Sequence, residues 1–341
     1  MLPSIEEIKN SISSQRNILI PSLKGYEPVP GLLGPEMYPG GFSVVFPFTD
    51  GAHKKALRVW HREIPEIKKR TFQISSYLSS IQDLPYFIHY EYISNGLVCS
   101  SGIKLDVVLM DWAEGVTLKD YIDGVFKSSN AVSEKEETLI VLAKSFYKLF
   151  IDLHNVSISH GDLQHGNILV KDADHISLID YDSLYVPTMG AKVSQVTAGL
   201  SGYQHPLRKK IQYSDKTNDY FSELIIISSL VILSEFPDIW DEFSIMDDDY
   251  SLLFSAQDYE NFRESKLFNR IYSRSQIVDR FLLEIERFLN NDLQTILPIE
   301  DVIKRIGFEW ELNSCSLYCI NCGNKFDDGD VFCINCGTKR L

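Results

Sequence analysis

The chain has 341 residues, of which 44% are hydrophobic and 23% are charged, and its formal net charge is −14. A single hydrophobic core seldom grows beyond about 250–300 residues, so this length favours a two-lobed unit with a small additional part. The acidic balance argues against nonspecific binding to nucleic acids and to anionic membranes, because both need a basic surface. We therefore expect a globular protein outside both of those classes.

The sequence also predicts a cytoplasmic location. The segment MLPSIEEIKN carries acids where a secretory signal has a basic region. The longest mainly apolar run, Leu224 to Leu233, is shorter than the ~20 residues that span a bilayer, so it predicts a buried helix. Five of the six cysteines lie between Cys315 and Cys336, which in a cytoplasmic chain is typical of a metal site rather than of disulfides.

The first third of the chain predicts strands and helices in alternation. A helix is expected over residues 4–18, where Ser4 and Glu7 form a possible capping box. Glycines and prolines around an apolar run then indicate turns and strands. Pro65 is expected at the first position of a second helix. The other expected elements are strands over 54–63 and 105–112 and a short helix over 117–123.

The rest of the chain is expected to be mainly helical. Ser133 and Glu136 form another possible capping box, at the start of a helix that reaches His154. Two short apolar runs, NILV and HISLID, are separated by KDAD and predict a β-hairpin. Further helices are expected over Tyr220–Leu233 and Gln276–Leu289.

The stretch SHGDLQHGNILV, which enters this hairpin, contains residues suited to phosphoryl transfer. That reaction needs a carboxylate to orient the attacking hydroxyl, oxygen ligands for Mg²⁺, and positive charge beside the phosphates. Asp162 is the candidate base, and Asn167 and Asp180 are the candidate magnesium ligands. The hairpin is expected to return Asp180 to a position facing Asn167. The spacing therefore predicts the catalytic loop of a phosphotransferase.

Other motifs stand before and after this loop. PGGFSVVF, with Gly40 and Gly41, looks like a reduced glycine-rich loop, and ALRVW places Arg58 on a strand. VLMDWAEG follows, and after the loop come DYD from Asp180, then GLSGYQHP, then NDYFSEL. In this order the motifs resemble those of the protein-kinase superfamily over roughly Gly31 to Asn290.

The resemblance implies roles for individual residues, with ATP and Mg²⁺ (or Mn²⁺) as cofactors. Arg58 takes the place of the strand lysine, and Met110 that of the gatekeeper. The acid of NDYFSEL, Asp219, is expected to brace the backbone of the catalytic loop. The residues expected to contact the nucleotide or its metal are Gly40, Gly41, Arg58, Met110, Asp111 through its carbonyl, Ala113 through its amide, Asn167 and Asp180.

The same resemblance implies an α+β, two-lobed protein-kinase-like fold, with a small β-rich N-lobe, a helical C-lobe and a small C-terminal zinc ribbon. The expected parts are an N-terminal helical extension (1–30), the N-lobe (31–113), the C-lobe (114–295), a linker (296–314) and the zinc ribbon (315–341).

Two departures from the family concern the strand cation. Arginine at position 58 keeps the positive charge but is not a geometric copy of lysine. The family's partner glutamate is also missing from its expected spacing, near residues 71–77, where Gln73 is the polar candidate. Glu63 and Glu66 come too early in the sequence. These changes fit either a re-engineered active site or a pseudokinase.

Further departures lie in and after the catalytic loop. Gln164 replaces the loop lysine, and Leu200 replaces the threonine that partners this lysine in Ser/Thr kinases. Gly161 replaces the arginine that reads a phosphorylated activation segment. His165 is expected to be structural rather than a phosphate ligand. Leu207 replaces a glutamate, so the family's buried C-lobe ion pair is expected to be absent.

The C-terminal sequence YCINCGNKFDDGDVFCINCGTKRL is the most specific motif in the chain. It contains two CxxCG units, and four thiolates at this spacing suit a tetrahedral Zn²⁺. Too few residues separate the pairs to form an apolar core, so zinc would supply the folding energy. The predicted ligands are Cys319, Cys322, Cys333 and Cys336. Cys315 is expected to be a spare thiol and Cys99 a core residue.

Three functions remain open. The first is an ATP-dependent Ser/Thr protein kinase, with Asp162, Asn167, Asp180 and Arg58 at its catalytic site and the ribbon as a docking module. The second is a pseudokinase scaffold, and the third is a small-molecule kinase. The chain resembles bacterial kinase-like proteins with a C-terminal zinc ribbon. That resemblance implies a protein substrate, and as partners a metal-dependent protein phosphatase and a von Willebrand factor A-type protein.

Overall fold

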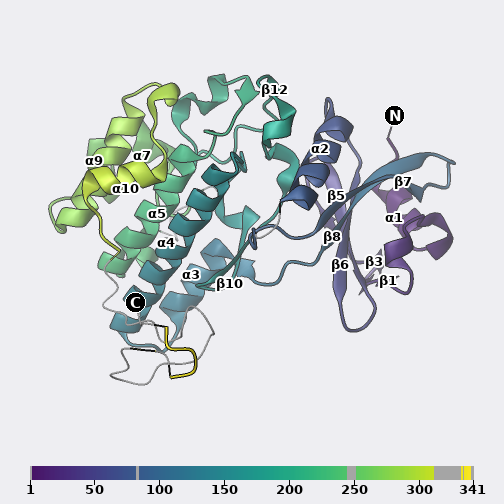
Figure 1. Ribbon diagram of the computed structural model, residues 1–341, viewed down its shortest axis with the longest axis horizontal. Coiled ribbons are helices and arrows are strands. Elements are labelled where there is room, and N and C mark those ends of the chain that lie inside the picture. The colour runs from purple at the N-terminus through teal and green to yellow at the C-terminus, as the bar shows by residue number, and fades with distance from the viewer. Residues whose placement is uncertain (1, 82–83, 244–250, 311–331, 333, 339–341) are drawn as a thin grey trace. The chain divides into compact units, whose positions relative to one another are not determined.

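The structure is a computed structural model that describes residues 2–81, 84–243, 251–310, 332 and 334–338. The chain divides into two compact units, Met1–Val302 and Ile303–Leu341. The first unit is a mixed α+β structure, with a β-sheet region early in the chain and a largely helical region after it (Figure 1). The α+β class predicted from the sequence is confirmed.

A six-stranded antiparallel sheet has the strand order β1-β5-β6-β8-β7, with β4 paired to β5. Alternate residues of β6 point to opposite faces, so Leu57 and Val59 enter the core while Arg58 faces the other way. This alternation positions the strand cation. The strands are β1 (Glu27–Pro28), β4 (Tyr38–Pro39), β5 (Ser43–Thr49), β6 (Lys54–Trp60), β7 (Tyr90–Val98) and β8 (Lys104–Asp111).

The helix α1 (Ile5–Ile12) covers the core face of this sheet with Ile8 and Ile12. Ser4 caps its start by accepting a hydrogen bond from Glu7 N–H, as predicted. The prediction that the helix reaches residue 18 was wrong. Ser13 is the C-cap residue of this helix, and Gln15–Asn17 forms a separate 3₁₀ turn.

The starts of two other helices also differ from the prediction. The helix α2 (Ile67–Ser80), which packs against β7, begins two residues after Pro65, because Glu66 adopts a left-handed backbone conformation (φ 57°). The helix α4 (Val132–Asn155) begins at Val132 with Ala131 as its cap, so the proposed Ser133–Glu136 capping box is wrong.

The helical region is built around α5 (Tyr220–Glu235), which is buried along almost its whole length between α4 and α9 (Gln276–Leu289) (Figure 1). The predictions of both α5 and α9 are confirmed. Within the described parts of the chain, no helix is long and apolar enough to cross a membrane. The remaining helices of this region are α3 (Leu118–Lys127), α6 (Ile239–Phe243), α7 (Ala256–Glu260) and α8 (Lys266–Ile271).

A small sheet of order β11-β10-β9 lies in the helical region and includes the predicted hairpin. Its strands are β9 (Val116–Thr117), β10 (Ile168–Asp172) and β11 (His175–Leu178). The other short pairs are β2 (Pro30–Gly31) with β3 (Gly34–Pro35), and β12 (Val193–Ser194) with β13 (Tyr213–Ser214).

The segment 296–314, predicted to be a linker, instead contains the helix α10 (Ile299–Ile306). Ile299 and Val302 are spaced three residues apart and are both fully buried, which accounts for the helix. Glu300 accepts a 3.0 Å hydrogen bond from His154 at the end of α4. The boundary between the two units falls after Val302, inside the segment predicted to be a linker.

Candidate functional site

The segment containing Asp162 joins α4 to β10 and is fixed by a buried carboxylate. Asp219, the N-cap residue of α5, accepts hydrogen bonds from the backbone N–H groups of His160 and Gly161, the latter at 2.8 Å. Asp219 is 1% exposed, so water does not compete for these bonds. The prediction that Asp219 braces this loop is confirmed.

Gly161 is required where it stands. It has a φ of +77°, and a Cβ at this position would lie 2.5 Å from the carbonyl oxygen of Ser183. The loop therefore packs against the backbone that follows Asp180 too closely for any side chain. Glycine at position 161 is therefore a packing requirement of this chain.

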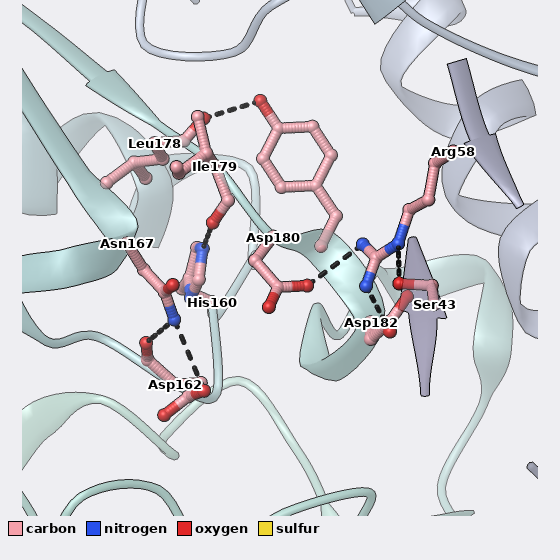
Figure 2. A network of polar contacts seen from close by, with 10 residues as sticks. Ser43, Arg58, His160, Asp162, Asn167, Leu178, Ile179, Asp180 and Asp182 are labelled. Atoms are coloured by element: carbon pink, nitrogen blue, oxygen red, sulfur yellow. Dashed lines mark hydrogen bonds and ion pairs between the residues drawn. The ribbon is translucent and has the colours of Figure 1, made fainter. Parts of the chain in front are cut away.

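The side chain of Asn167 holds the loop closed over Asp162. Its Nδ2 donates to the Asp162 carbonyl at 2.9 Å and to Asp162 Oδ2 at 3.2 Å (Figure 2). The other carboxylate oxygen, Oδ1, is buried without a partner in the described residues. The Cβ of an alanine at Gly199 would lie 3.1 Å from that oxygen. A narrow space therefore remains beside the candidate base.

The β10–β11 hairpin returns the chain to the same loop. The N–H of Ile179 donates to the Asn167 carbonyl at 2.9 Å. His160 Nε2 donates to the Ile179 carbonyl, also at 2.9 Å (Figure 2). Asp180 follows in a left-handed conformation, with φ 65° and ψ 73°. The predicted return of Asp180 to the neighbourhood of Asn167 is confirmed.

Arg58 joins the sheet to this loop. Its Nη1 donates to Asp180 Oδ1 at 2.9 Å, and its Nη2 donates to Asp182 Oδ2 at 2.6 Å (Figure 2). Its Nε donates to Ser43 Oγ at 2.7 Å. The guanidinium is thus held by three partners from two distant parts of the chain. Four of the predicted site residues, Arg58, Asp162, Asn167 and Asp180, are thereby brought into one network.

The surroundings of the three carboxylates in the site shift their pKa values in different directions. Burial raises the pKa of Asp162 to about 6, and the nearby charge of Asp180 adds to this effect. Burial also acts on Asp180, but the charge and hydrogen bond of Arg58 outweigh it and lower the pKa of Asp180 below its usual value. Burial raises the pKa of Asp182 to about 6 against the attraction of Arg58. All three are therefore mainly ionised at neutral pH.

Asn167 and Asp180 are suitable magnesium ligands by their chemistry. Mg²⁺ prefers oxygen donors, and the Asp180 side chain is 45% exposed, so a face of its carboxylate stays open to solvent beside Arg58. The amide nitrogen of Asn167 is turned toward Asp162, which leaves the amide oxygen for a ligand. Among the described residues, no cluster of three or more His, Cys, Asp or Glu side chains suited to a metal is found.

Three residues of the network were missed by sequence reasoning. Asp182 supplies the acid that no glutamate of α2 provides, since Arg58 pairs only with Asp180 and Asp182 in the described chain. Ser43 accepts from Arg58. Arg70 of α2 donates to the carbonyls of Ser183, Leu184 and Ser194. In the sequence, Asp182 could have been found as the second acid of the DYD motif.

The predicted substitute on α2, Gln73, does not join the network. Its Nε2 donates to the carbonyl of Thr188 at 3.1 Å. Gln164 also turns away from the site, because its Oε1 accepts a bond from Gly166 N–H and caps a local 3₁₀ turn. His165 Nδ1 lies 2.8 Å from the Tyr203 hydroxyl in the interior. His165 is therefore structural, as predicted.

The residues predicted to contact adenine lie at and just after the carboxyl end of β8, an inner strand of the sheet. Met110 is near the end of β8, pairs with Ala56 of β6, and is 8% exposed. Asp111 ends the strand, and Ala113 follows it. Gly115 lets the chain pass close to β10, since a Cβ there would lie 2.8 Å from the Val170 backbone.

The two predicted loop glycines connect β4 to β5. Gly40 and Gly41 are both exposed, and Gly40 N–H donates to the Ser43 carbonyl at 2.8 Å. A Cβ at Gly41 would meet nothing within 4 Å, so its backbone is open to a ligand. The turn also carries Ser43 into contact with Arg58.

The predicted zinc site lies almost entirely outside the described residues. Cys319, Cys322 and Cys333 are not described, and neither is Cys315. Cys336 is exposed, with its Sγ 3.1 Å from the Thr338 hydroxyl. Cys99 is 4% exposed within the sheet core, which confirms its predicted packing role.

No protein-family model matches the chain, and no curated protein matches it. The functional inference therefore depends on the side chains of this chain. Its strongest element is the convergence of residues 58, 162, 167 and 180 from separate segments.

Proposed function

We propose that this chain is an ATP-dependent protein kinase of the two-lobed, protein-kinase-like type, which transfers the γ-phosphoryl group to Ser or Thr hydroxyls of a protein. The observation that carries the proposal is the network in which Arg58 of the sheet binds Asp180 while Asn167 binds Asp162. A carboxylate, an amide and a cation from separate segments meet as the reaction requires.

In this proposal Asp162 orients the attacking hydroxyl and accepts its proton. Its pKa of about 6 leaves it mainly ionised at neutral pH yet close enough to that pH for proton transfer. Asn167 holds Asp162 in place through two hydrogen bonds and offers its amide oxygen to the metal. The bound Mg²⁺ supplies charge neutralisation at the phosphates, with Asp180 as its second protein ligand.

Arg58 is proposed to hold the nucleotide phosphates, as the strand lysine does in the family that the chain resembles. The planar fork of arginine can bind two oxygens together, which suits both the carboxylates that it holds and a phosphate. Asp182 then takes the role of the glutamate that α2 lacks. Met110, Asp111, Ala113, Gly40 and Gly41 are proposed to surround the adenine and the phosphates.

The cysteine-rich tail is proposed to bind Zn²⁺ through Cys319, Cys322, Cys333 and Cys336 and to dock a protein partner. The support is the repeated CxxCG spacing. We propose a cytoplasmic location and, following the resemblance, a metal-dependent phosphatase and a von Willebrand factor A-type protein as candidate partners. Zinc content per chain, measured before and after Cys322→Ser with Cys315→Ser as the control, tests the ligand set.

A labelled-ATP assay tests the proposed activity. Wild type and Asp162→Asn are compared in Mg²⁺ and in Mn²⁺, with proteins encoded nearby as substrates. We expect Asp162→Asn to lower transfer by about 10²–10⁴-fold with ATP binding retained, because the base is lost and the shape kept. The absence of transfer by folded wild type under every metal and substrate condition would remove the proposal.

A pseudokinase scaffold is the second candidate, and one observation favours it. Each of the three nitrogens of the Arg58 guanidinium already donates one hydrogen bond, to Ser43, Asp180 or Asp182, so nucleotide phosphates would have to share this cation with two carboxylates. This candidate predicts that ATP binds weakly or not at all, and that partner binding survives Asp162→Asn. Calorimetry with Mg-ATP and a pull-down with the variant distinguish the two candidates.

A further inference from the structure

A cavity of about 270 Å³ lies at the amino-terminal end of α5, away from the Arg58 network. It is bordered by Pro206–Lys210, by the chain that leads into α5, and by Leu293 and Ile296. Its polar lining includes Arg208, Asn218 and Lys210 together with one acid, Asp215. The proposed kinase mechanism uses none of these side chains.

Arg208 is a buried cation without an acidic partner in the described chain. It is 4% exposed, and its Nε and Nη2 have no hydrogen-bond acceptor. Its Nη1 reaches only the Asn218 carbonyl, at 3.5 Å. Burial lowers the pKa of Arg208, against the attraction of Asp219 and Asp215. A buried guanidinium in this state calls for an acceptor, because unpaired buried charge is strongly unfavourable.

A second unsatisfied donor lines the same cavity. Asn218 is 7% exposed, and its Oδ1 accepts from Asp215 N–H at 3.3 Å, so its Nδ2 is left without a partner. A group that satisfies both side chains must therefore be a hydrogen-bond acceptor. Buried groups of this kind are nearly always satisfied by protein, water or a bound ion.

The acids nearby are turned to other donors. Asp219 accepts from the N–H groups of His160 and Gly161, and Asp215 Oδ1 accepts from the N–H and hydroxyl of Thr217. Lys210 adds a cation at the exposed rim. The first turn of a 16-residue helix adds the positive end of its dipole. Two cations, an amide donor and a helix N-terminus together suit a doubly charged oxyanion better than a carboxylate.

We propose that the cavity formed by Arg208, Asn218 and Lys210 at the start of α5 binds a phosphate group. The phosphate would be either free or carried by a phosphorylated peptide. The ligand would accept hydrogen bonds from the Arg208 guanidinium and from Asn218 Nδ2. The site is separate from that of phosphoryl transfer, but Asn218 directly precedes Asp219, which holds the catalytic loop. Occupancy would therefore fix the segment on which Asp219 stands.

Calorimetric titration of the full chain, without ATP, tests this proposal. The ligands are inorganic phosphate, a phosphoserine peptide, the same peptide unphosphorylated, and acetate at matched ionic strength. We expect saturable binding of phosphate, of the phosphoserine peptide or of both, and none of acetate or the plain peptide. A peptide that binds tighter than inorganic phosphate assigns the source to a phosphorylated protein; equal binding assigns it to a free phosphate.

Substitutions test whether phosphate binds in this cavity. Asn218→Asp keeps the acceptor for Asp215 N–H but replaces the donor by a negative charge, so we expect phosphate affinity to fall by at least about tenfold. Lys210→Ala should weaken binding by a smaller factor, and Lys209→Ala, also exposed but outside the lining, should leave it unchanged. Wild type without saturable binding, or Asn218→Asp with wild-type affinity, overturns the proposal.

Discussion

Two buried guanidinium groups in this chain have opposite surroundings. Arg58 and Arg208 are 7% and 4% exposed, so each has lost almost all contact with water. Arg58 donates to one hydroxyl and two carboxylates, whereas Arg208 makes one hydrogen bond, at 3.5 Å, to the residues that the structure describes. The first group closes a network between segments of the chain. The second leaves donors unsatisfied, which is the state expected of a site that takes its acceptor from outside.

Arg70 is a third buried guanidinium, and it is stabilised in a different way. It is 6% exposed and donates to three backbone carbonyls of the segment that follows Asp182. Carbonyl groups stabilise the cation without neutralising it. The three arginines therefore differ in surroundings: carboxylates pair with Arg58, backbone carbonyls surround Arg70, and Arg208 has no acidic partner in the described chain. Removing each charge should therefore change the free energy of unfolding differently. The difference can be measured by substitution.

The largest effect is expected at the paired site. Asp182→Asn keeps the shape of the side chain but removes one of the two charges around Arg58. Removing one partner of a buried pair lowers the free energy of unfolding by about 3–5 kcal/mol. We expect a loss of less than about 3 kcal/mol, because Asp180 remains and because the neutral side chain avoids the cost of burying the Asp182 charge, the cost that raises the pKa of Asp182. Chemical denaturation at about pH 8, where Asp182 is ionised, measures the change.

Two controls decide whether the loss comes from the unpaired cation. Glu114→Gln breaks the exposed pair with Lys171 and should change the free energy of unfolding by less than about 1 kcal/mol. Arg58→Met combined with Asp182→Leu removes the charge and a partner together and should recover much of the loss. If Asp182→Asn is as stable as wild type, Arg58 is not held by this pair.

The opposite sign is expected at the unpaired site. Arg208→Met keeps most of the volume of the side chain and removes a buried charge that has no acidic partner. Without phosphate we expect the free energy of unfolding to stay the same or rise, by up to about 2 kcal/mol. With phosphate, wild type should gain stability and the variant should not. A large loss in the variant without phosphate would mean that Arg208 already has a partner.

The sequence predicted which residues form the candidate site better than it predicted which of them bind one another. Asp162, Asn167 and Asp180 were found because their spacing along a loop and hairpin is local, and the structure brings them together as expected. Arg58 was found from its strand. Its partner was not, because choosing Asp182 over a glutamate of α2 depends on how the helix packs on the loop.

Burial was the other property that sequence patterns could not supply. Arg70 follows two lysines and is indistinguishable in sequence from a solvated charge, yet it is buried. Arg208 precedes two lysines and is hidden in the same way. Helix ends were missed where backbone conformation decided them, as at Glu66, whose left-handed conformation starts α2. These features depend on tertiary contacts, which override local preference.

The smallest effect is expected at the candidate base, Asp162. Burial raises the pKa of Asp162 to about 6, with Asp180 and Asp219 acting in the same direction and with His160 and Asn167 opposing it. Because only the ionised carboxylate can accept a proton, kcat/KM for phosphoryl transfer should fall about tenfold per pH unit below about pH 6. A rate profile between about pH 5 and 8 measures the midpoint.

Arg208 interacts favourably with the Asp162 carboxylate, so Arg208→Met should raise the pKa of Asp162 and move this midpoint to higher pH. The expected shift is less than about one unit, since burial, His160 and Asp180 have the larger effects on the pKa of Asp162. Lys209→Ala is the matched control and should leave the midpoint unchanged. A midpoint near about pH 4 in wild type would mean that Asp162 is not the group whose ionisation limits the reaction.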